Sequence, residues 1–401
     1  MVGICPLGNP IREYAWGSRS AIAELLAQPT PSPRPQAEIW MGAHPTDPSR
    51  ARCSDSWVPL PDLLRADPTG LLGERAAARF DGEFPFLFKV LAAAQPLSIQ
   101  AHPNREQARE GFERENAAGI ALGARERSYP DPHPKPELIC ALSPFSALCG
   151  FRPIPEIVRA FRESEVDAFS TEVESLESEA DSKALERLFA AVWNADADRI
   201  GRGIEQVVTN AKRRSEDPAA RWMTAIAALY PGDAGVLAPL YLNLVSLAPG
   251  EAMYLGAGEL HSYLEGTGIE IMGNSDNVLR GGLTDKHVDI LELSRVLRFE
   301  PHEPEVLLPR ETSTGERVFE TPAHEFELAV LTVVEDKPWR SARLRGVEIL
   351  LAIEGEMTIT DRGAGESFTL ARGASVLIPD SVESYELTGA GVVYRAGVPE
   401  R

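Results

Sequence analysis

The stretch SIQAHPN (98–104) places an amide and an imidazole two residues apart, at Gln100 and His102, with Pro103 directly behind the histidine. Positions i and i+2 of a β-strand point to the same face, so the two side chains would lie side by side on one surface of a sheet. Both side chains offer an atom that can bind a metal ion. Taken alone, the pair is more typical of a polar strand end that runs into a loop, so the rest of the chain decides its interpretation.

A second stretch, HPKPELICAL (133–142), repeats this spacing with Lys135 and Glu137. The prolines at 134 and 136 favour an extended backbone before and within the stretch. A strand that continues into the apolar LICAL would bury both charges, and such burial is costly unless each charge has a partner. A metal ion would be such a partner for Glu137.

Two segments align without gaps: GEAMYLGAGELH (250–261) and GASVLIPDSVES (373–384). Both resemble the second conserved motif of the cupin jelly roll, G-x5-P-x-G-x2-H, although the first has glycine in place of the proline. The first segment ends on His261 and the second on Ser384. An inward histidine can reach a metal at the mouth of a tapering barrel, and a serine cannot replace that imidazole. We therefore expect a metal-binding first barrel and a metal-free second barrel.

One amide oxygen, two imidazoles and one carboxylate form a candidate metal-ligand set: Gln100, His102, Glu137 and His261. Imidazole and carboxylate ligands suit zinc, and a mixed nitrogen and oxygen set leaves a position for water or substrate. One anionic ligand on a divalent ion leaves a net charge of about +1, which can still polarise a hydroxyl or carbonyl oxygen. We therefore expect one Zn²⁺ per chain.

The bulk composition excludes several classes of partner. The chain has 401 residues, of which 43% are hydrophobic and 25% charged, and its formal net charge is -20. Such a charge disfavours nucleic acid and anionic membranes, so a phosphorylated ligand would need a local cluster of cations. Four scattered cysteines without a CxxC spacing predict neither a thiolate zinc site nor a disulfide framework. The N-terminus resembles neither a signal peptide nor a membrane span, which favours a cytoplasmic protein.

The spacing of apolar residues changes along the chain and predicts its domains. Residues 1–152 and 236–298 are rich in short apolar strands with turns between them, which predicts two parts of one catalytic cupin domain. Residues 153–235 show helical spacing; in KALERLFAAVW (183–193), apolar residues recur on one helix face. Residues 299–401 return to short strands and predict a second, metal-free cupin domain. The expected fold class is mainly β with an α-helical insertion: two cupin-type jelly-roll barrels plus a helical domain.

Several stretches are long and specific enough to compare with a known family. They are YAWG (14–17), AEIWMGAHP (37–45), PFLFKVL (85–91), QPLSIQAHPN (95–104), KPEL (135–138), FSALCGFRP (145–153) and GELHSYLEGTGIEIMGNSDNVLRGGLTDK (258–286). In the same order, they resemble type I phosphomannose isomerases. The resemblance implies a zinc cupin, with zinc on the four ligands named above, that interconverts mannose 6-phosphate and fructose 6-phosphate. It also implies sugar phosphates as partners, and we expect a monomer.

One position departs from the family pattern. Family members often have a histidine directly before Lys-Pro-Glu, whereas this chain has Pro134 there and His133 one residue further back. The resemblance therefore carries no catalytic role over to His133.

The implied reaction moves a proton between C1 and C2 of the sugar through a cis-enediol. Such a site needs a cation for the oxygen that becomes negative and a base for the carbon-bound proton. The stretch NVLRGGLTDK (277–286) supplies Arg280 and Lys286, and Gly281 and Gly282 would let the backbone turn tightly between them. We assign the enediolate to Arg280 and the phosphate to Lys286; a solvated loop is the alternative for both.

Four further residues complete the predicted substrate site. Lys89 lies in the apolar FPFLFKVL (84–91), where an unpaired buried lysine is costly, and we place it at the phosphate. Ser98 shares a strand face with the candidate ligands and would join it there. Glu38 and Trp16 would line the sugar pocket; a core strand end and a packed indole are the alternatives.

Two residues are candidates for the catalytic base. Glu270, in the strand GIEIMG (268–273), is a carboxylate in the family's active-site region, and its alternative role is to hold Arg280 in place. Lys135 qualifies if desolvation lowers its pKa.

Two other functions fit parts of the pattern. An iron or manganese cupin oxygenase would keep the barrel, but such enzymes usually rely on three histidines, whereas this ligand set contains only His102 and His261. A non-catalytic sugar- or phosphate-binding module would keep the fold without the isomerisation. The combination of metal ligands and cations favours the isomerase.

Overall fold

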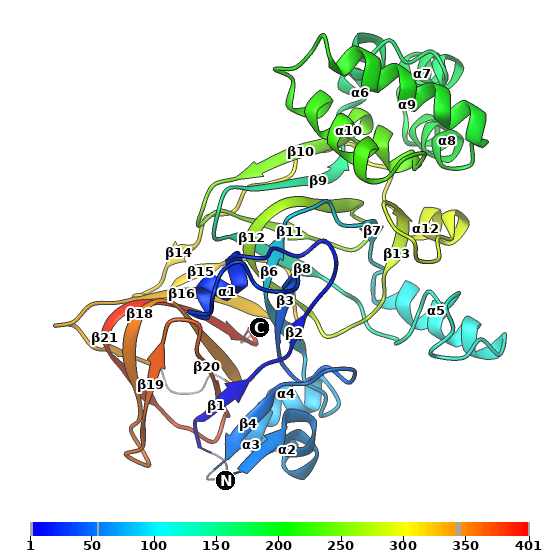
Figure 1. Ribbon diagram of the computed structural model, residues 1–401. Coiled ribbons are helices and arrows are strands. Elements are labelled where there is room, and N and C mark those ends of the chain that lie inside the picture. The colour runs from blue at the N-terminus through cyan, green and yellow to red at the C-terminus, as the bar shows by residue number, and fades with distance from the viewer. Residues whose placement is uncertain (1–2, 54–55, 342–345, 400–401) are drawn as a thin grey trace.

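The computed structural model of the protein describes residues 3–53, 56–341 and 346–399. The largest parts of the molecule are two antiparallel sheets and one group of helices (Figure 1). The helical group lies at one end, beyond strands β9 (Phe145–Phe151) and β10 (Leu242–Leu247). The expected fold class is confirmed: the protein is mainly β with a helical insertion.

The first sheet carries most of the candidate site residues. It contains β9 and β10 together with β2 (Ile11–Arg12), β3 (Glu38–Met41), β6 (Phe86–Ala93), β7 (Ile99–Ala101), β8 (Glu137–Ala141), β11 (Ala252–Leu255), β12 (His261–Gly273) and β13 (Leu279–Gly282). The order is β10-β9-β12-β6-β3-β2, with the remaining strands paired onto this path. Every residue of β6 is buried, as its continuous apolar run predicts. Strand β12 pairs with β6, β7, β8 and β9, so it forms the centre of the sheet.

The second sheet forms the C-terminal barrel. Its strands are β14 (Arg310–Glu311), β15 (Arg317–Phe319), β16 (Glu327–Val333), β17 (Trp339–Arg340), β18 (Glu348–Asp361), β19 (Ser367–Ala371), β20 (Ser375–Ile378) and β21 (Tyr385–Gly397), joined by β1 (Cys5–Gly8), β4 (Arg50–Cys53) and β5 (Ser56–Pro59). Cys5 of β1 lies opposite Leu377 of β20, so the start of the chain extends the sheet of the C-terminal barrel. The domain limits inferred from the sequence stay predictions.

The helical group is built from amphipathic helices that share one core. They are α6 (Ile154–Glu163), α7 (Ser170–Glu179), α8 (Ser182–Trp193), α9 (Ala197–Ala211), α10 (Pro218–Leu229), the 3-10 helix η1 (Ala234–Leu237) and α11 (Ala238–Tyr241). In α8, Leu185, Leu188, Phe189 and Val192 are buried, which confirms the helical spacing.

The other helices lie outside this group. They are α1 (Ala21–Leu25), α2 (Leu60–Ala66), α3 (Pro68–Leu72), α4 (Glu74–Arg79), α5 (Arg105–Ala117) and α12 (Ile290–Val296). Helix α5 begins three residues after His102 and is capped by Asn104, whose side chain accepts from the backbone N–H of Gln107. Among the residues that the structure describes, no helix is both long and apolar enough to cross a bilayer.

The aligned repeat occupies equivalent places in the two sheets. In the first copy β11 leads to β12, and in the second β20 leads to β21. His261 is the first residue of β12, whereas Ser384 directly precedes β21. The alignment of the two segments thus reflects a real structural correspondence between the barrels.

Candidate metal centre and substrate cavity

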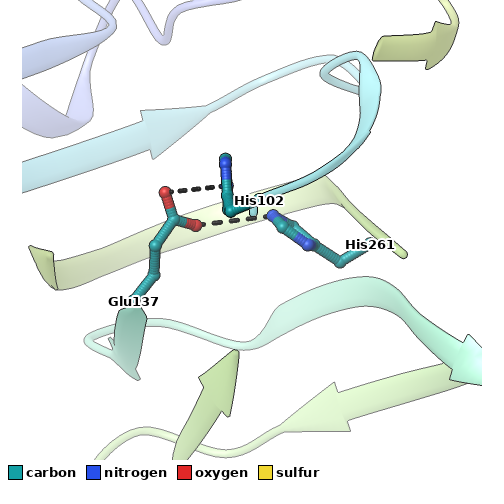
Figure 2. Close-up of side chains that lie close together, drawn as sticks. All are labelled: His102, Glu137 and His261. Carbon is teal, nitrogen blue, oxygen red and sulfur yellow. Dashed lines mark ion pairs between the residues drawn. The ribbon is translucent and has the colours of Figure 1, made fainter. Parts of the chain in front are cut away.

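Neighbouring strands bring the candidate ligands together from distant parts of the sequence. His261 of β12 lies directly opposite Gln100 of β7. His102 follows the last residue of β7, and Glu137 begins β8, a neighbour of β12. Figure 2 shows the imidazoles of His102 and His261 directed toward the carboxylate of Glu137.

The three side chains form a compact, buried cluster. Nε2 of His102 lies 3.2 Å from Oε1 of Glu137, and Nε2 of His261 lies 3.4 Å from Oε2. One potential ligand atom from each residue lies within 4.8 Å of the others. The amide nitrogen of Gln100 is 3.5 Å from Nε2 of His261, and a flip of the amide would present its oxygen instead. The four predicted ligands are therefore neighbours; their role as ligands stays a prediction.

The backbone orients both histidines for ligation. Nδ1 of His102 donates to the carbonyl oxygen of Asn277 at 2.8 Å, and Nδ1 of His261 donates to that of Glu259 at 2.9 Å. With the proton held on Nδ1, each Nε2 keeps a lone pair directed at the cluster. Such outer contacts are typical of metal-binding histidines.

The donor atoms of the cluster fit a divalent metal ion. Nε2 of His102 and Oε2 of Glu137 are buried without a hydrogen-bond partner, which is unfavourable unless something else satisfies them. Burial lowers the pKa of His102 to about 4, so its imidazole is neutral and can donate its lone pair at pH 7. Burial would raise the pKa of Glu137, but His102 and Lys135 outweigh it and hold that pKa well below its usual value. A neutral imidazole and an ionised carboxylate are the forms that bind a metal.

A cavity of about 740 Å³ adjoins the cluster. Gln100 and Glu137 reach its wall, whereas His102 and His261 are 0% and 1% exposed. The other predicted site residues also line it: Trp16, Glu38, Lys89, Ser98, Lys135, Glu270, Arg280 and Lys286. The volume lies in the range of pockets that hold small ligands.

Lys89 is held between two carboxylates at the cavity wall. Its Nζ lies 2.8 Å from Oε2 of Glu270 and 3.4 Å from Oε1 of Glu38. Burial would lower the pKa of Lys89, but these two carboxylates outweigh it and raise the pKa. Burial raises the pKa of Glu270 despite the nearby ammonium. Glu270 thus pairs with Lys89, which argues against the alternative in which it holds Arg280.

Lys135 and Ser98 lie close to the ligand residues. Nζ of Lys135 is 3.3 Å from Oε1 of Glu137, and its side chain is almost completely buried. The hydroxyl of Ser98 donates to Oε1 of Gln100 at 3.4 Å, which agrees with a shared strand face. Both side chains line the cavity, so each can reach a bound ligand.

Arg280 and Lys286 differ in their surroundings. Arg280 lies on β13 and is half-buried, so a solvated loop is wrong for this residue; burial lowers its pKa, against the attraction of Asp276. Lys286 lies in an exposed bend. Partial burial of its ammonium lowers its pKa, and repulsion from Arg280 lowers this pKa further. Both side chains line the cavity, and together they form a local cationic edge.

The role expected for Gly281 and Gly282 is wrong. Both belong to strand β13, and the residue with positive φ is Leu283, at 54°. Glycine is needed at 282 because a Cβ there would lie 2.6 Å from both Trp193 and Asp233. Close packing, rather than a tight turn, explains this glycine.

An ion pair at the cavity wall was not predicted from the sequence. His44 is 2% exposed, its Nε2 lies 3.2 Å from Oδ1 of Asp276, and its ring packs against the edge of Trp40. Burial would raise the pKa of Asp276, but the hydrogen bond and charge of His44 lower it. A signal was present: the tripeptide AHP around His44 repeats that around His102.

His133 does not take the place of the family's missing histidine. Its Nε2 lies 3.0 Å from Oε2 of Glu83, and its side chain is 40% exposed. The ring therefore forms an ion pair at the surface, while the backbone carbonyl of His133 accepts from the amide of Asn277.

Together, the fold and the site define a cupin in which a buried cluster of potential metal ligands lies beside a cavity lined by charged side chains. Two family models match the chain: phosphomannose isomerase type I, catalytic domain, over residues 4–154, and its helical insertion domain over 161–242. The chain belongs to the type I phosphomannose isomerase family.

Similar proteins cover almost the whole chain. Mannose-6-phosphate isomerase of Escherichia coli (strain K12) is 39% identical over 391 residues, which is 96% of this chain and 97% of the relative. The Homo sapiens protein of the same name is 32% identical over 408 residues, with 94% and 93% covered. A mutant phosphomannose isomerase from Salmonella typhimurium has a TM-score of 0.93 at 37% identity, and a zinc-bound mannose 6-phosphate isomerase has 0.91 at 37%; both comparisons cover 99% of each chain.

We expect Glu137→Gln to abolish stable metal binding, because it removes the only anionic donor of the predicted ligand set. Added Zn²⁺ should raise the unfolding temperature of the unmodified protein. At a Zn²⁺ concentration a hundredfold above Kd, the free energy of unfolding should increase by about 2.7 kcal/mol. It should leave that of Glu137→Gln nearly unchanged. Glu270→Gln is the matched control, because it removes another buried carboxylate of the cavity. This variant should keep the zinc-dependent rise in unfolding temperature. Equal shifts in both variants, measured by calorimetry, would contradict the ligand assignment.

Proposed function

We propose that this chain is a zinc-dependent isomerase that interconverts mannose 6-phosphate and fructose 6-phosphate. The observation that carries the proposal is the convergence of His102, Glu137 and His261 beside a cavity with a cationic edge. The family of the chain supports the reaction, and the zinc-bound neighbour supports the metal. We further propose that the enzyme is a cytoplasmic monomer that binds neither nucleic acid nor membrane.

The residues that would hold the zinc ion are Gln100, His102, Glu137 and His261. When bound, zinc supplies positive charge that polarises the sugar oxygens. Arg280 provides a second cation where negative charge develops on the cis-enediol, and its fixed position on β13 avoids reorganisation during the reaction. The walls of the cavity orient the sugar so that C1 and C2 face the base.

Glu270 is the base that we favour. Burial raises its pKa, which brings a carboxylate closer to the range useful for proton abstraction near neutral pH. Lys89 balances its charge at 2.8 Å and can stabilise the ionised form. Lys135 stays the alternative base, and it would have to be a neutral amine to accept the carbon-bound proton.

The phosphate would lie at the cationic edge of the cavity. Lys286 is exposed there and lies near Arg280, so it can neutralise an anion that arrives from solvent. Ser98 can donate a hydrogen bond. We also expected Lys89 at the phosphate. Its ammonium is already shared by Glu270 and Glu38, so we instead assign Lys89 the role of charge partner of the base Glu270.

The pocket wall around the sugar includes two further residues. Trp16 stacks on Tyr14 with ring centroids 5.6 Å apart and lines the cavity. Glu38 accepts a hydrogen bond from Nε1 of Trp40 at 2.9 Å in addition to its pairing with Lys89. These contacts hold both side chains in place, as a shape-selective wall requires.

Metal removal tests the proposed function. We expect the purified protein to contain one zinc ion per chain and to convert mannose 6-phosphate to fructose 6-phosphate. Chelation should abolish turnover, and returned Zn²⁺ should restore it, because the metal charge contributes several kcal/mol to the transition state. A zinc-loaded protein that binds the sugar phosphate without turnover would instead be a binding module, and oxygen consumption would indicate an oxygenase.

Arg280→Ala should lower kcat by about 10²–10³, the usual cost of removing one preorganised donor to a developing oxyanion. Substrate binding should change less, because the charge on the enediol oxygen exists only in the transition state. Arg280→Lys, which keeps a cation, is the control and should retain more activity. A kcat near that of the unmodified enzyme would show that the oxyanion role is wrong.

The acidic limb of the pH profile of kcat/KM should reflect the pKa of Glu270. A carboxylate base works only when ionised, so activity falls as the pH drops through its raised pKa. Lys89→Met removes the ammonium that lowers this pKa, and the limb should therefore move to higher pH by about one unit or more. Lys89→Arg keeps the charge and should leave the limb in place. An unmoved limb in Lys89→Met would identify Lys135 as the better candidate.

A further inference from the structure

Strand β13, which carries Arg280 and leads to Lys286, is irregular near its end. In the pairing of β13 with β7, the register shifts between Arg280 and Gly282, which marks a β-bulge. Bulges bend a strand, redirect its side chains and occur often beside active sites. The contacts around this bulge therefore determine where the two cations point.

Leu283 directly follows the bulge and has a backbone φ of 54°. This left-handed conformation is unfavourable for a residue with a Cβ and persists only where neighbouring groups enforce it. Its backbone N–H donates to Oδ2 of Asp233 at 2.9 Å, and its side chain is 2% exposed. Asp233 therefore binds the backbone at the strained residue itself.

Asp233 belongs to the helical group and not to the sheet that carries the cations. Its second oxygen, Oδ1, accepts from the backbone N–H of Gly235 at 2.7 Å and caps η1. One carboxylate thus joins the start of a helix to the segment behind the bulge. A Cβ at Gly235 would lie 2.8 Å from a side-chain carbon of Leu283, so the Leu283 side chain packs closely against the backbone of Gly235.

Gly282 shows how closely the helical group packs against this segment. A side chain at 282 would meet the Trp193 ring and Oδ1 of Asp233 at 2.6 Å. Trp193 is the last residue of α8, so two separate elements of the helical group touch the segment. The insertion therefore packs directly against the segment with the cationic edge, and Asp233 itself lines the same cavity.

We propose that Asp233 is a positioning residue for the isomerisation: by holding Leu283 in the left-handed conformation, it directs Arg280 and Lys286 into the cavity. This inference rests on the proposed function, which assigns the enediolate and the phosphate to these two cations. Although Asp233 lines the cavity, we infer that it acts through these two cations.

Double-mutant cycles test this coupling. Asp233→Ala should lower kcat/KM about tenfold in the otherwise unmodified enzyme, while the zinc content stays the same. In an Arg280→Ala or a Lys286→Ala background, the same substitution should lower kcat/KM by a smaller factor, because one of the two residues through which it acts is already gone. The split between kcat and KM should follow the cation concerned: kcat for Arg280 and KM for Lys286.

Asp196→Ala is the matched control. Asp196 caps α9 in the same helical group, where it accepts from the backbone N–H of Arg199 at 2.8 Å. Its loss should cost stability and leave both kinetic parameters unchanged. If Asp233→Ala fails to fold, Asp233→Asn replaces it, since the amide keeps one acceptor for Gly235 and cannot accept from Leu283 with the other atom.

Two outcomes would overturn the inference without touching the proposed function. In the first, the enzyme is active and Asp233→Ala or Asp233→Asn leaves kcat/KM unchanged. In the second, the loss is the same in all backgrounds, which would mean that Asp233 acts independently of both cations. Absence of isomerase activity in the unmodified, zinc-loaded protein would instead overturn the proposed function.

Discussion

The register of strand β12 is the constraint on which the candidate site depends. Its pairing places His261 opposite Gln100 at one end and Glu270 opposite Lys89 nearer the other. A slip of one residue would turn each of its inward side chains to the opposite face of the sheet. Because β12 is held by four neighbouring strands, such a slip would break many backbone hydrogen bonds at once. The donor cluster and the buried ion pair are thus two consequences of one strand pairing.

Charge is compensated locally throughout the site, although the chain as a whole is strongly acidic. Glu270 and Glu38 share the ammonium of Lys89, and Asp276 pairs with His44. Glu137 lies beside His102, His261 and Lys135, and its Oε2 has no hydrogen-bond partner, which leaves it suited to a divalent cation. Arg280 and Lys286 of the cationic edge form none of these pairs, although Asp276 attracts both of them. A sugar phosphate that enters the cavity would therefore meet positive charge at the edge and polar donors inside, whatever the net charge of the protein.

Much of this could be predicted from short-range sequence patterns. The two-residue spacing at Gln100 and His102 encodes a shared strand face, and the aligned repeat identifies His261. Helical spacing predicts α8 with the correct buried face. The partners of Lys89 could not be found in this way, because Glu38 and Glu270 lie far from it in the sequence. Gly282 was misread for the same reason: its need for glycine comes from an element of another domain.

The sequence by itself determined the types of donor in the candidate metal site, the face on which each donor lies and the alternation of sheet and helix. These properties follow from the fixed periods of strands and helices, which act over a few residues. Only the tertiary structure decided which faces meet: the ion pair of Lys89, the contact of His44 with Asp276, and the support of Leu283 by Asp233. Such contacts join segments that the chain separates by many residues, so they depend on how whole elements pack together.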